Sequence, residues 1–247
     1  MSEVNPKPLF VFLHGAGLGA FIWEELVDNL SYDTVCIDYP LRANAAKLPK
    51  SNTLQAYVNH CESQLQAYAE RKIVLVVHSI GGCVGLELAA RLGSRLQLFI
   101  GLSAAIPPPG GAFMDMFSPV PRLLTLAFLK LLGTKPPAKV IQQTLCTGLA
   151  DHITERITQS YTPEPLALYT DRITAGLPAV NRFYICFQED KSFTLSQQQK
   201  FAAQLAATET ITIPGGHLAM LSHGAELASC LESFVRLDMT TNTRDTR

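Results

Sequence analysis

One short segment constrains the fold of this chain more than any other. It is a buried strand that ends near a serine and turns at once into a helix. The strand, Ile73–Val77, is apolar and mostly β-branched, and two glycines, Gly81 and Gly82, closely follow Ser79. A sharp strand-to-helix turn exposes the serine oxygen at the edge of the sheet and points the first N–H groups of the helix at whatever is attacked. The segment therefore predicts a nucleophile elbow and acyl transfer through a serine ester.

The order of apolar runs predicts an α/β protein. Strand-like runs alternate with helical patterns, and the strands are apolar throughout, which is typical of a parallel sheet covered on both faces. The expected strands are 9–13, 34–37, 73–77, 96–102, 183–187 and 210–213, and the expected helices include 21–30, 53–71, 195–205 and 225–237.

A break in this alternation predicts an insertion. Prolines 107–109 and two glycines interrupt the pattern, and no clear buried strand follows until about residue 177. We therefore expect a first part of the core over 1–105, a helical cap over 106–177, a second part of the core over 178–238, and a polar tail over 239–247. A cap presents some apolar side chains to the site beneath it, and the candidates for the pocket are Phe113, Met114, Phe117 and Phe128.

A serine hydroxyl needs a general base within hydrogen-bond reach, and the base needs an acid to orient it. Because ligands of open α/β sheets gather at the carboxyl ends of the strands, both partners should come just after predicted strands. His217 follows the last strand and Asp190 follows the strand before it, with Glu189 as the alternative acid. We expect Ser79 to be the nucleophile, His217 the base and Asp190 the acid.

The negative charge that develops on the substrate oxygen needs two backbone N–H donors. One is expected from Ile80, directly after the nucleophile. The second is expected from the loop His14–Gly17, most simply from Ala16, because glycines there let the backbone approach a substrate closely. His14 and His78 flank these turns, and we expect them to serve in packing or turn hydrogen bonds rather than in proton transfer.

Four segments carry a resemblance to a known family. They are Phe12-Leu13-His14-Gly15-Ala16 with Trp23 downstream, Val77-His78-Ser79-Ile80-Gly81-Gly82, Leu102-Ser103-Ala104-Ala105, and His217-Leu218-Ala219-Met220-Leu221-Ser222. In these segments the chain resembles α/β-hydrolases of the esterase and hydroxynitrile-lyase branch, which includes the plant methylesterases. The resemblance implies a mostly parallel, eight-stranded sheet flanked by helices, a helical cap, the triad Ser79, Asp190 and His217, and no cofactor.

Two departures from the family pattern refine this expectation. The first position of the usual G-x-S-x-G elbow is Val77 here. The lyase members carry a lysine just after the catalytic histidine and a threonine in the first loop, where this chain has Leu218 and Gly15. Without a cation to stabilise a departing cyanide, esterase chemistry is favoured over lyase chemistry.

Overall composition leads us to expect neither a nucleic-acid nor a membrane partner. The formal net charge is −1, which favours neither nucleic acid nor an anionic membrane surface. The best apolar run, Leu123–Leu132, is too short to cross a bilayer and contains Lys130. The six cysteines are scattered, without metal-ligand spacing, and the start of the chain lacks the apolar core of a signal peptide. We expect a cytoplasmic protein with reduced cysteines and no metal, and leave its oligomeric state open.

These observations predict a serine hydrolase of the carboxylesterase type. Its substrates would be small to medium, mostly apolar esters, cleaved through an acyl-enzyme intermediate. Two alternatives stay open at this point. The same residues could cleave a lactone, thioester, amide or carbon–carbon bond, or the chain could be a non-catalytic ligand-binding protein on the same fold.

Overall fold

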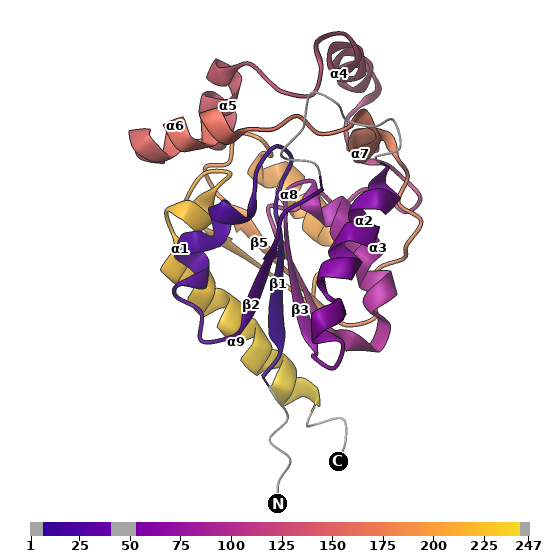
Figure 1. Ribbon diagram of the computed structural model, residues 1–247, viewed down its shortest axis with the longest axis vertical. Helices are drawn as coiled ribbons and strands as arrows, with labels where there is room; N and C mark the ends of the chain where they lie inside the picture. The colour runs from indigo at the N-terminus through magenta and orange to yellow at the C-terminus, as the bar shows by residue number, and fades with distance from the viewer. Residues whose placement is uncertain (1–6, 41–52, 243–247) are drawn as a thin grey trace, which may run out of the picture.

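A computed structural model describes residues 7–40 and 53–242, and its centre is a parallel sheet (Figure 1). The strands are β1 (Leu9–Leu13), β2 (Thr34–Ile37), β3 (Ile73–His78), β4 (Leu96–Leu102), β5 (Asn181–Phe187) and β6 (Glu209–Ile213). They lie in the order β2-β1-β3-β4-β5-β6, and every neighbouring pair is parallel. The expectation of eight strands is wrong, because within the described residues the sheet has six. These six are the apolar runs of the sequence, and only the family resemblance implied two more.

Helices cover both faces of the sheet. Those packed around it are α1 (Glu24–Val27), α2 (Leu54–Gln64), α3 (Gly81–Leu92), α8 (Leu195–Gln204) and α9 (Gly224–Asn242). Alternate residues of each strand enter two separate cores. Leu9, Val11 and Leu13 of β1 pack with residues of α2, α3 and α8, whereas Phe10 and Phe12 pack with residues of α1 and α9. Burial on both sides explains why the strands are apolar at every position.

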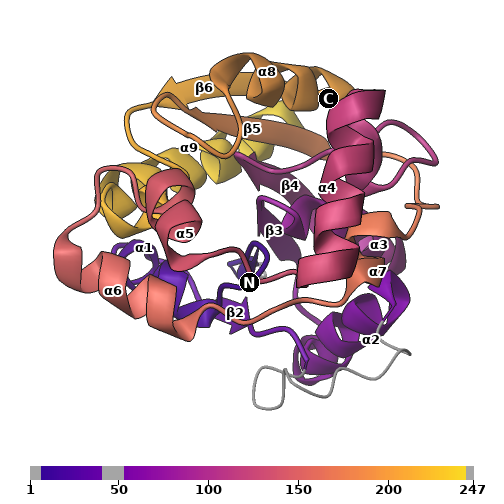
Figure 2. The same ribbon diagram turned by 90° about the horizontal axis from the view of Figure 1, so that it is seen from above.

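A second group of helices lies between β4 and β5 in the chain. It comprises the short 3-10 helix η5 (Phe113–Met116) and the helices α4 (Pro119–Leu132), α5 (Ala138–Leu145), α6 (Asp151–Ser160) and α7 (Leu166–Thr170). These helices lie across the carboxyl ends of the strands, and Figure 2 shows α4, α5, α6 and α7 arranged around the ends of β3 and β4. We call residues 113–170 the cap.

The chain that returns from the cap to β5 is fixed to the core by Glu87 of α3. The backbone N–H groups of Thr174 and Ala175 donate to Oε1 of Glu87, the latter at 3.0 Å, and Nε2 of Gln55 donates to Oε2 at 3.0 Å. Burial raises the pKa of Glu87, but these hydrogen bonds outweigh burial and leave the pKa below its usual value. A carboxylate that stays charged is thus part of the connection between cap and core.

Two helices end at other residues than the sequence predicts. The predicted tail begins at residue 239, yet α9 continues to Asn242. Asp238 accepts hydrogen bonds from Nδ2 of Asn181 at 2.7 Å and from Nε2 of Gln97 at 3.2 Å, so the end of the helix is tied to the sheet by polar contacts that a hydrophobic pattern does not reveal. The helix expected over 53–71 ends at Gln64 and continues as a 3-10 turn.

Two general features accompany this architecture. All six cysteines are free thiols. Within the described part of the chain, no helix is both long and apolar enough to span a lipid bilayer.

Candidate active site

Ser79 occupies the sharp turn between β3 and α3. Its backbone has a φ of 54°, in the left-handed region that residues with a side chain rarely adopt. Two hydrogen bonds hold this conformation, because the carbonyl of Ser79 accepts from the N–H groups of Gly82 at 3.0 Å and Ala105 at 2.8 Å. The strained turn is therefore built into the junction of strand and helix.

The glycines after Ser79 are required by space. A Cβ on Gly82 would lie 2.3 Å from the carbonyl oxygen of Ala105, and one on Gly81 would lie 2.8 Å from the carbonyl oxygen of Leu13. No side chain fits at either position. The pair of glycines lets the first turn of α3 sit directly against the ends of β1 and β4.

Asp190 and His217 meet at the carboxyl ends of β5 and β6. Nδ1 of His217 donates a hydrogen bond to Oδ2 of Asp190 at 2.7 Å, and both side chains are buried. Because Nδ1 carries the proton in this bond, Nε2 is the ring nitrogen that can accept one. Glu189, the alternative acid, is exposed to solvent. Of the two candidate acids, Asp190 is therefore the one that contacts His217.

Three further donors surround the carboxylate of Asp190. The hydroxyl of Ser103 donates to Oδ2 at 2.6 Å, and the N–H groups of Ser192 and Phe193 donate to Oδ1 at 2.7 and 3.0 Å. Burial raises the pKa of Asp190, but the charge and hydrogen bond of His217, together with Ser103 and Phe193, lower the pKa to about 2. Asp190 is thus a carboxylate at any pH near neutrality.

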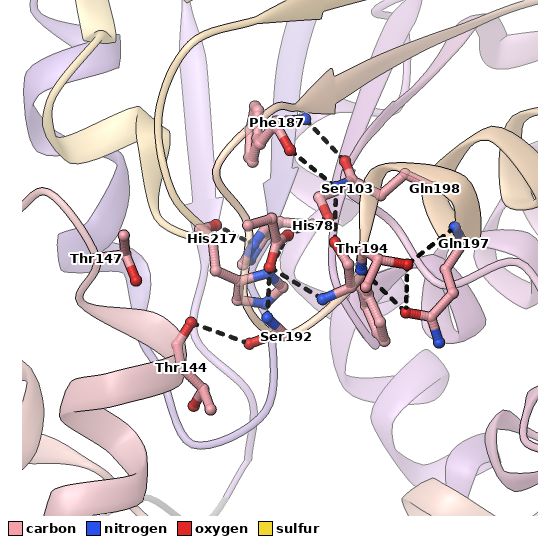
Figure 3. Close-up of polar contacts among 12 residues, drawn as sticks. His78, Ser103, Thr144, Thr147, Phe187, Ser192, Thr194, Gln197, Gln198 and His217 are labelled. Carbon is pink, nitrogen blue, oxygen red and sulfur yellow. Dashed lines mark hydrogen bonds and ion pairs between the residues drawn. The ribbon is translucent and has the colours of Figure 1, made fainter.

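The turn that carries Asp190 is held by a buried glutamine, Gln198 of α8. Its side-chain Oε1 accepts from the N–H of Phe187 at 2.7 Å, and Nε2 donates to the carbonyls of Phe187 and Phe193 at 2.9 and 2.8 Å. Figure 3 shows this amide beside the backbone of Phe187, with Ser103, Ser192 and His217 grouped next to it. The glutamine fixes both ends of the turn and so the position of Asp190.

His78 supports the backbone of His217. Its Nε2 lies 2.9 Å from the carbonyl oxygen of His217 and must donate, since a carbonyl only accepts. Burial and the neighbouring His217 hold the pKa of His78 well below its usual value, so the ring is neutral. His14 bonds within its own turn, with Nδ1 2.8 Å from the carbonyl oxygen of Gly15. The geometry assigns both rings to hydrogen bonds that hold turns.

The loop after β1 lies against the nucleophile. A Cβ on Gly15 would lie 2.9 Å from Cβ of Ser79. The next glycine is held by the cap on both sides, because the N–H of Gly17 donates to Oε1 of Glu164 at 3.0 Å and its carbonyl accepts from the N–H of Thr162 at 3.0 Å. The hydroxyl of Tyr57 donates to the other oxygen of Glu164 at 2.5 Å. With the N–H of Gly17 engaged by Glu164, the preceding amide, that of Ala16, is the better candidate to face a substrate.

A cavity of about 500 Å³ joins these parts. Its core side is formed by Ala16, Ser79, Phe193 and His217, and its cap side includes Phe113, Met114, Phe117, Thr125, Leu129, Tyr161 and Tyr169. Three of the four pocket candidates therefore face the cavity. The fourth, Phe128, does not line the cavity, and its side chain is 42% exposed. Helical periodicity alone does not tell which face of an insertion turns inward.

The sequence did not predict the roles of Ser103, Gln198 and Glu164 at the site. Ser103 directly follows a strand, with a φ of 40°, and its place at a strand end was the available signal. Gln198 and Glu164 lie in helical or turn-rich stretches that carry no recognisable pattern. Within the described residues there is no group of three or more His, Cys, Asp or Glu side chains arranged to hold a metal ion.

Comparison with known proteins gives a consistent result. Residues 10–229 match the model of the alpha/beta hydrolase family. The chain is similar to norfluorocurarine synthase 1 of a Strychnos species, with 24% identity over 90% of this chain and 93% of that protein. It is also similar to polyneuridine aldehyde esterase of Rauvolfia serpentina, with 25% identity and the same coverage. A methylesterase structure from Arabidopsis superposes with a TM-score of 0.74 at 21% identity, covering 94% of this chain and 100% of that one.

Proposed function

Because this chain belongs to the alpha/beta hydrolase family, we propose that it is a serine esterase. It hydrolyses carboxylic esters of small to medium, mostly apolar substrates through an acyl-enzyme intermediate. One observation carries the proposal. His217, which is bonded to Asp190 at 2.7 Å, lines the same cavity as Ser79 in its left-handed turn.

The proposed reaction begins with attack by the hydroxyl of Ser79 on the ester carbonyl carbon. Nε2 of His217 takes the hydroxyl proton and later gives it to the leaving alcohol, while Asp190 holds the ring and stabilises the imidazolium. The amides of Ala16 and Ile80 donate to the oxygen on which negative charge develops. Water, deprotonated by His217, then attacks the acyl-enzyme; the bond to Ser79 breaks, the acid leaves, and His217 returns the proton to the oxygen of Ser79. No cofactor enters these steps.

The cavity supports the proposed substrate class. Its wall is formed largely by apolar and aromatic side chains such as Phe117, Leu129 and Phe193, which favour apolar acyl or alcohol groups. Polyneuridine aldehyde esterase, similar over most of its length, is an esterase by name, and this supports hydrolysis of an ester over that of another bond.

The test is hydrolysis of a p-nitrophenyl ester by the full-length protein. Ser79→Ala should lower kcat on the order of 10⁴- to 10⁶-fold, because the nucleophile is lost. Ser233→Ala, which removes an exposed hydroxyl from α9, is the matched control and should keep the activity. Full activity of Ser79→Ala would refute the proposal.

A fluorophosphonate probe separates an enzyme from a non-catalytic binding protein. The activated hydroxyl of a working site becomes covalently modified, and mass spectrometry should locate the adduct on the peptide that contains Ser79. An unmodified serine in a folded protein would favour the binding protein.

A further inference from the structure

The outer face of α4 is apolar and turned to solvent. The large exposed side chains of α4 are Val120, Leu123, Leu124, Phe128, Leu131 and Leu132, with exposed fractions of 70, 70, 66, 42, 81 and 70%. By helical periodicity, the four that lie on the outer face are Val120, Leu123, Leu124 and Leu131. No residue of this helix is fully buried. Burying one such side chain typically contributes about 1.5–3 kcal/mol, so a contiguous exposed group of this kind usually marks an interaction surface.

The same helix has a second face that belongs to the cavity. Thr125 and Leu129 line the cavity, and Leu126 and Leu129 are partly buried against the core. In an α-helix these positions point away from Leu124 and Leu131. Contact with the fold thus accounts for the inner face of α4 and leaves the outer face without a role in packing.

The stretch of sequence that contains α4 carries only positive charges. From residue 116 to residue 150 the sequence contains Arg122, Lys130, Lys135 and Lys139 and no Asp or Glu, although the net charge of the whole chain is −1. Arg122 pairs with Asp115, and the three lysines are exposed. The acidic residues of the cap resume on α6, which lies across the cap from α4 in Figure 2. The average charge of the chain therefore hides a cationic stretch that begins on α4 and continues to the start of α5.

We propose that the outer face of α4, together with Lys130 on the same helix and Lys135 and Lys139 in the segment that follows it, docks the cap onto an anionic lipid surface. A helix with an apolar face and flanking lysines lies in the plane of a lipid interface, with its apolar side chains below the headgroups. Each lysine near an anionic surface adds to the attraction. A second copy of the chain is a poorer occupant, since a two-fold interface on this face would bring the lysines of both copies together.

Docking in this orientation places the cavity beside the lipid. The inner face of α4 lines the cavity and its outer face would lie in the interface, so an ester dissolved in the lipid meets the mouth of the site. This last step rests on the proposed esterase function, whereas docking itself does not.

The experiment is sedimentation with vesicles of phosphatidylcholine, with and without phosphatidylglycerol. The wild-type protein should sediment with the anionic vesicles, and added salt should release it, because salt screens the lysines. Lys130→Gln/Lys135→Gln/Lys139→Gln should weaken partitioning by about 100-fold or more, and Leu124→Gln/Leu131→Gln by at least about tenfold. Lys200→Gln on α8 and Leu177→Gln are the matched controls and should bind like the wild type.

Catalysis and folding are monitored separately. Binding is also measured with Ser79→Ala, so that a failure of the proposed esterase function leaves the docking result unaffected. The thermal midpoint reports the fold of each variant, and Leu131→Gln alone replaces the double leucine variant should that one unfold. A wild-type protein that stays in the supernatant with anionic vesicles, or leucine and lysine variants that sediment unchanged, would overturn the proposal. So would a dimer in the absence of lipid that Leu124→Gln/Leu131→Gln dissociates.

Discussion

Cγ1 of Val77 lies 2.4 Å from the point where a Cβ on Gly85 would stand. Val77 holds the first position of the serine turn, where glycine is usual, and Gly85 lies one turn into the helix that follows. The valine is accommodated because the helix has no side chain opposite it. The geometry of the turn around Ser79 therefore depends on this pair.

Gly85→Ala should destabilise the protein by about 1–3 kcal/mol, because the new methyl group overlaps Val77 in a packed core. The better helix propensity of alanine, about 1 kcal/mol, acts in the opposite direction and does not compensate. Urea unfolding measures the effect. In a Val77→Ala background the same substitution should cost much less, and an equal cost in both backgrounds would contradict the pairing.

Asp190→Asn should lower kcat for an ester by about 10⁴-fold, because the amide no longer orients the productive tautomer of His217. Ser103→Ala removes a single hydrogen bond to the same carboxylate and should lower kcat/KM by about tenfold. Steady-state kinetics on one ester compares the two. Activity of Asp190→Asn equal to that of the wild type would remove Asp190 from the proposed triad.

The low pKa of Asp190 also predicts how stability depends on pH. The pKa is about 2 in the folded protein, below the ordinary value of 3.8 for an aspartate, so the carboxylate stabilises the fold above the unfolded pKa and loses this contribution as pH falls. The contribution is about 2 kcal/mol at neutral pH and roughly half of that near pH 3. The difference in unfolding free energy between wild type and Asp190→Asn, measured from pH 6 to pH 3, should shrink below pH 4. A constant difference over this range would contradict the assignment.

Glu164 is expected to act on the proposed oxyanion loop through Gly17. Glu164→Ala removes the acceptor for the N–H of Gly17 and should lower kcat by about 10- to 100-fold with little change in KM, because the adjacent amide of Ala16 loses its position. Glu164→Gln keeps one acceptor oxygen and should retain more activity. A fall in thermal stability with unchanged kcat would show that the residue serves the fold alone.

The sequence predicts those features that depend on burial or on a tight turn. The apolar runs locate the six strands, and the glycines beside Ser79 mark the turn. The resemblance to α/β-hydrolases of the methylesterase branch is confirmed by the family match and by the relatives.

Features that depend on polar contacts between distant segments were not predictable. Gln198 bonds to Phe187, eleven residues earlier in the chain, and so holds the turn that carries Asp190. Asp238 bonds to Asn181 and so ties the end of α9 to the sheet. The orientation of Phe128 depends on which side of α4 meets the core, and an amphipathic pattern with apolar residues on both faces does not decide that. These contacts are set by the packed fold, and single-sequence periodicity has no access to them.

The hydrogen bonds that join the cap to Gly17 have one more consequence. Glu164 accepts from the N–H of Gly17 and Thr162 donates to its carbonyl, so any outward movement of this part of the cap must either break both bonds or carry the loop with it. If the amide of Ala16 stabilises the charged oxygen as proposed, opening of the cap would also displace that amide. The closed cap described here is then the state in which the proposed mechanism has both amides in place for the substrate oxygen.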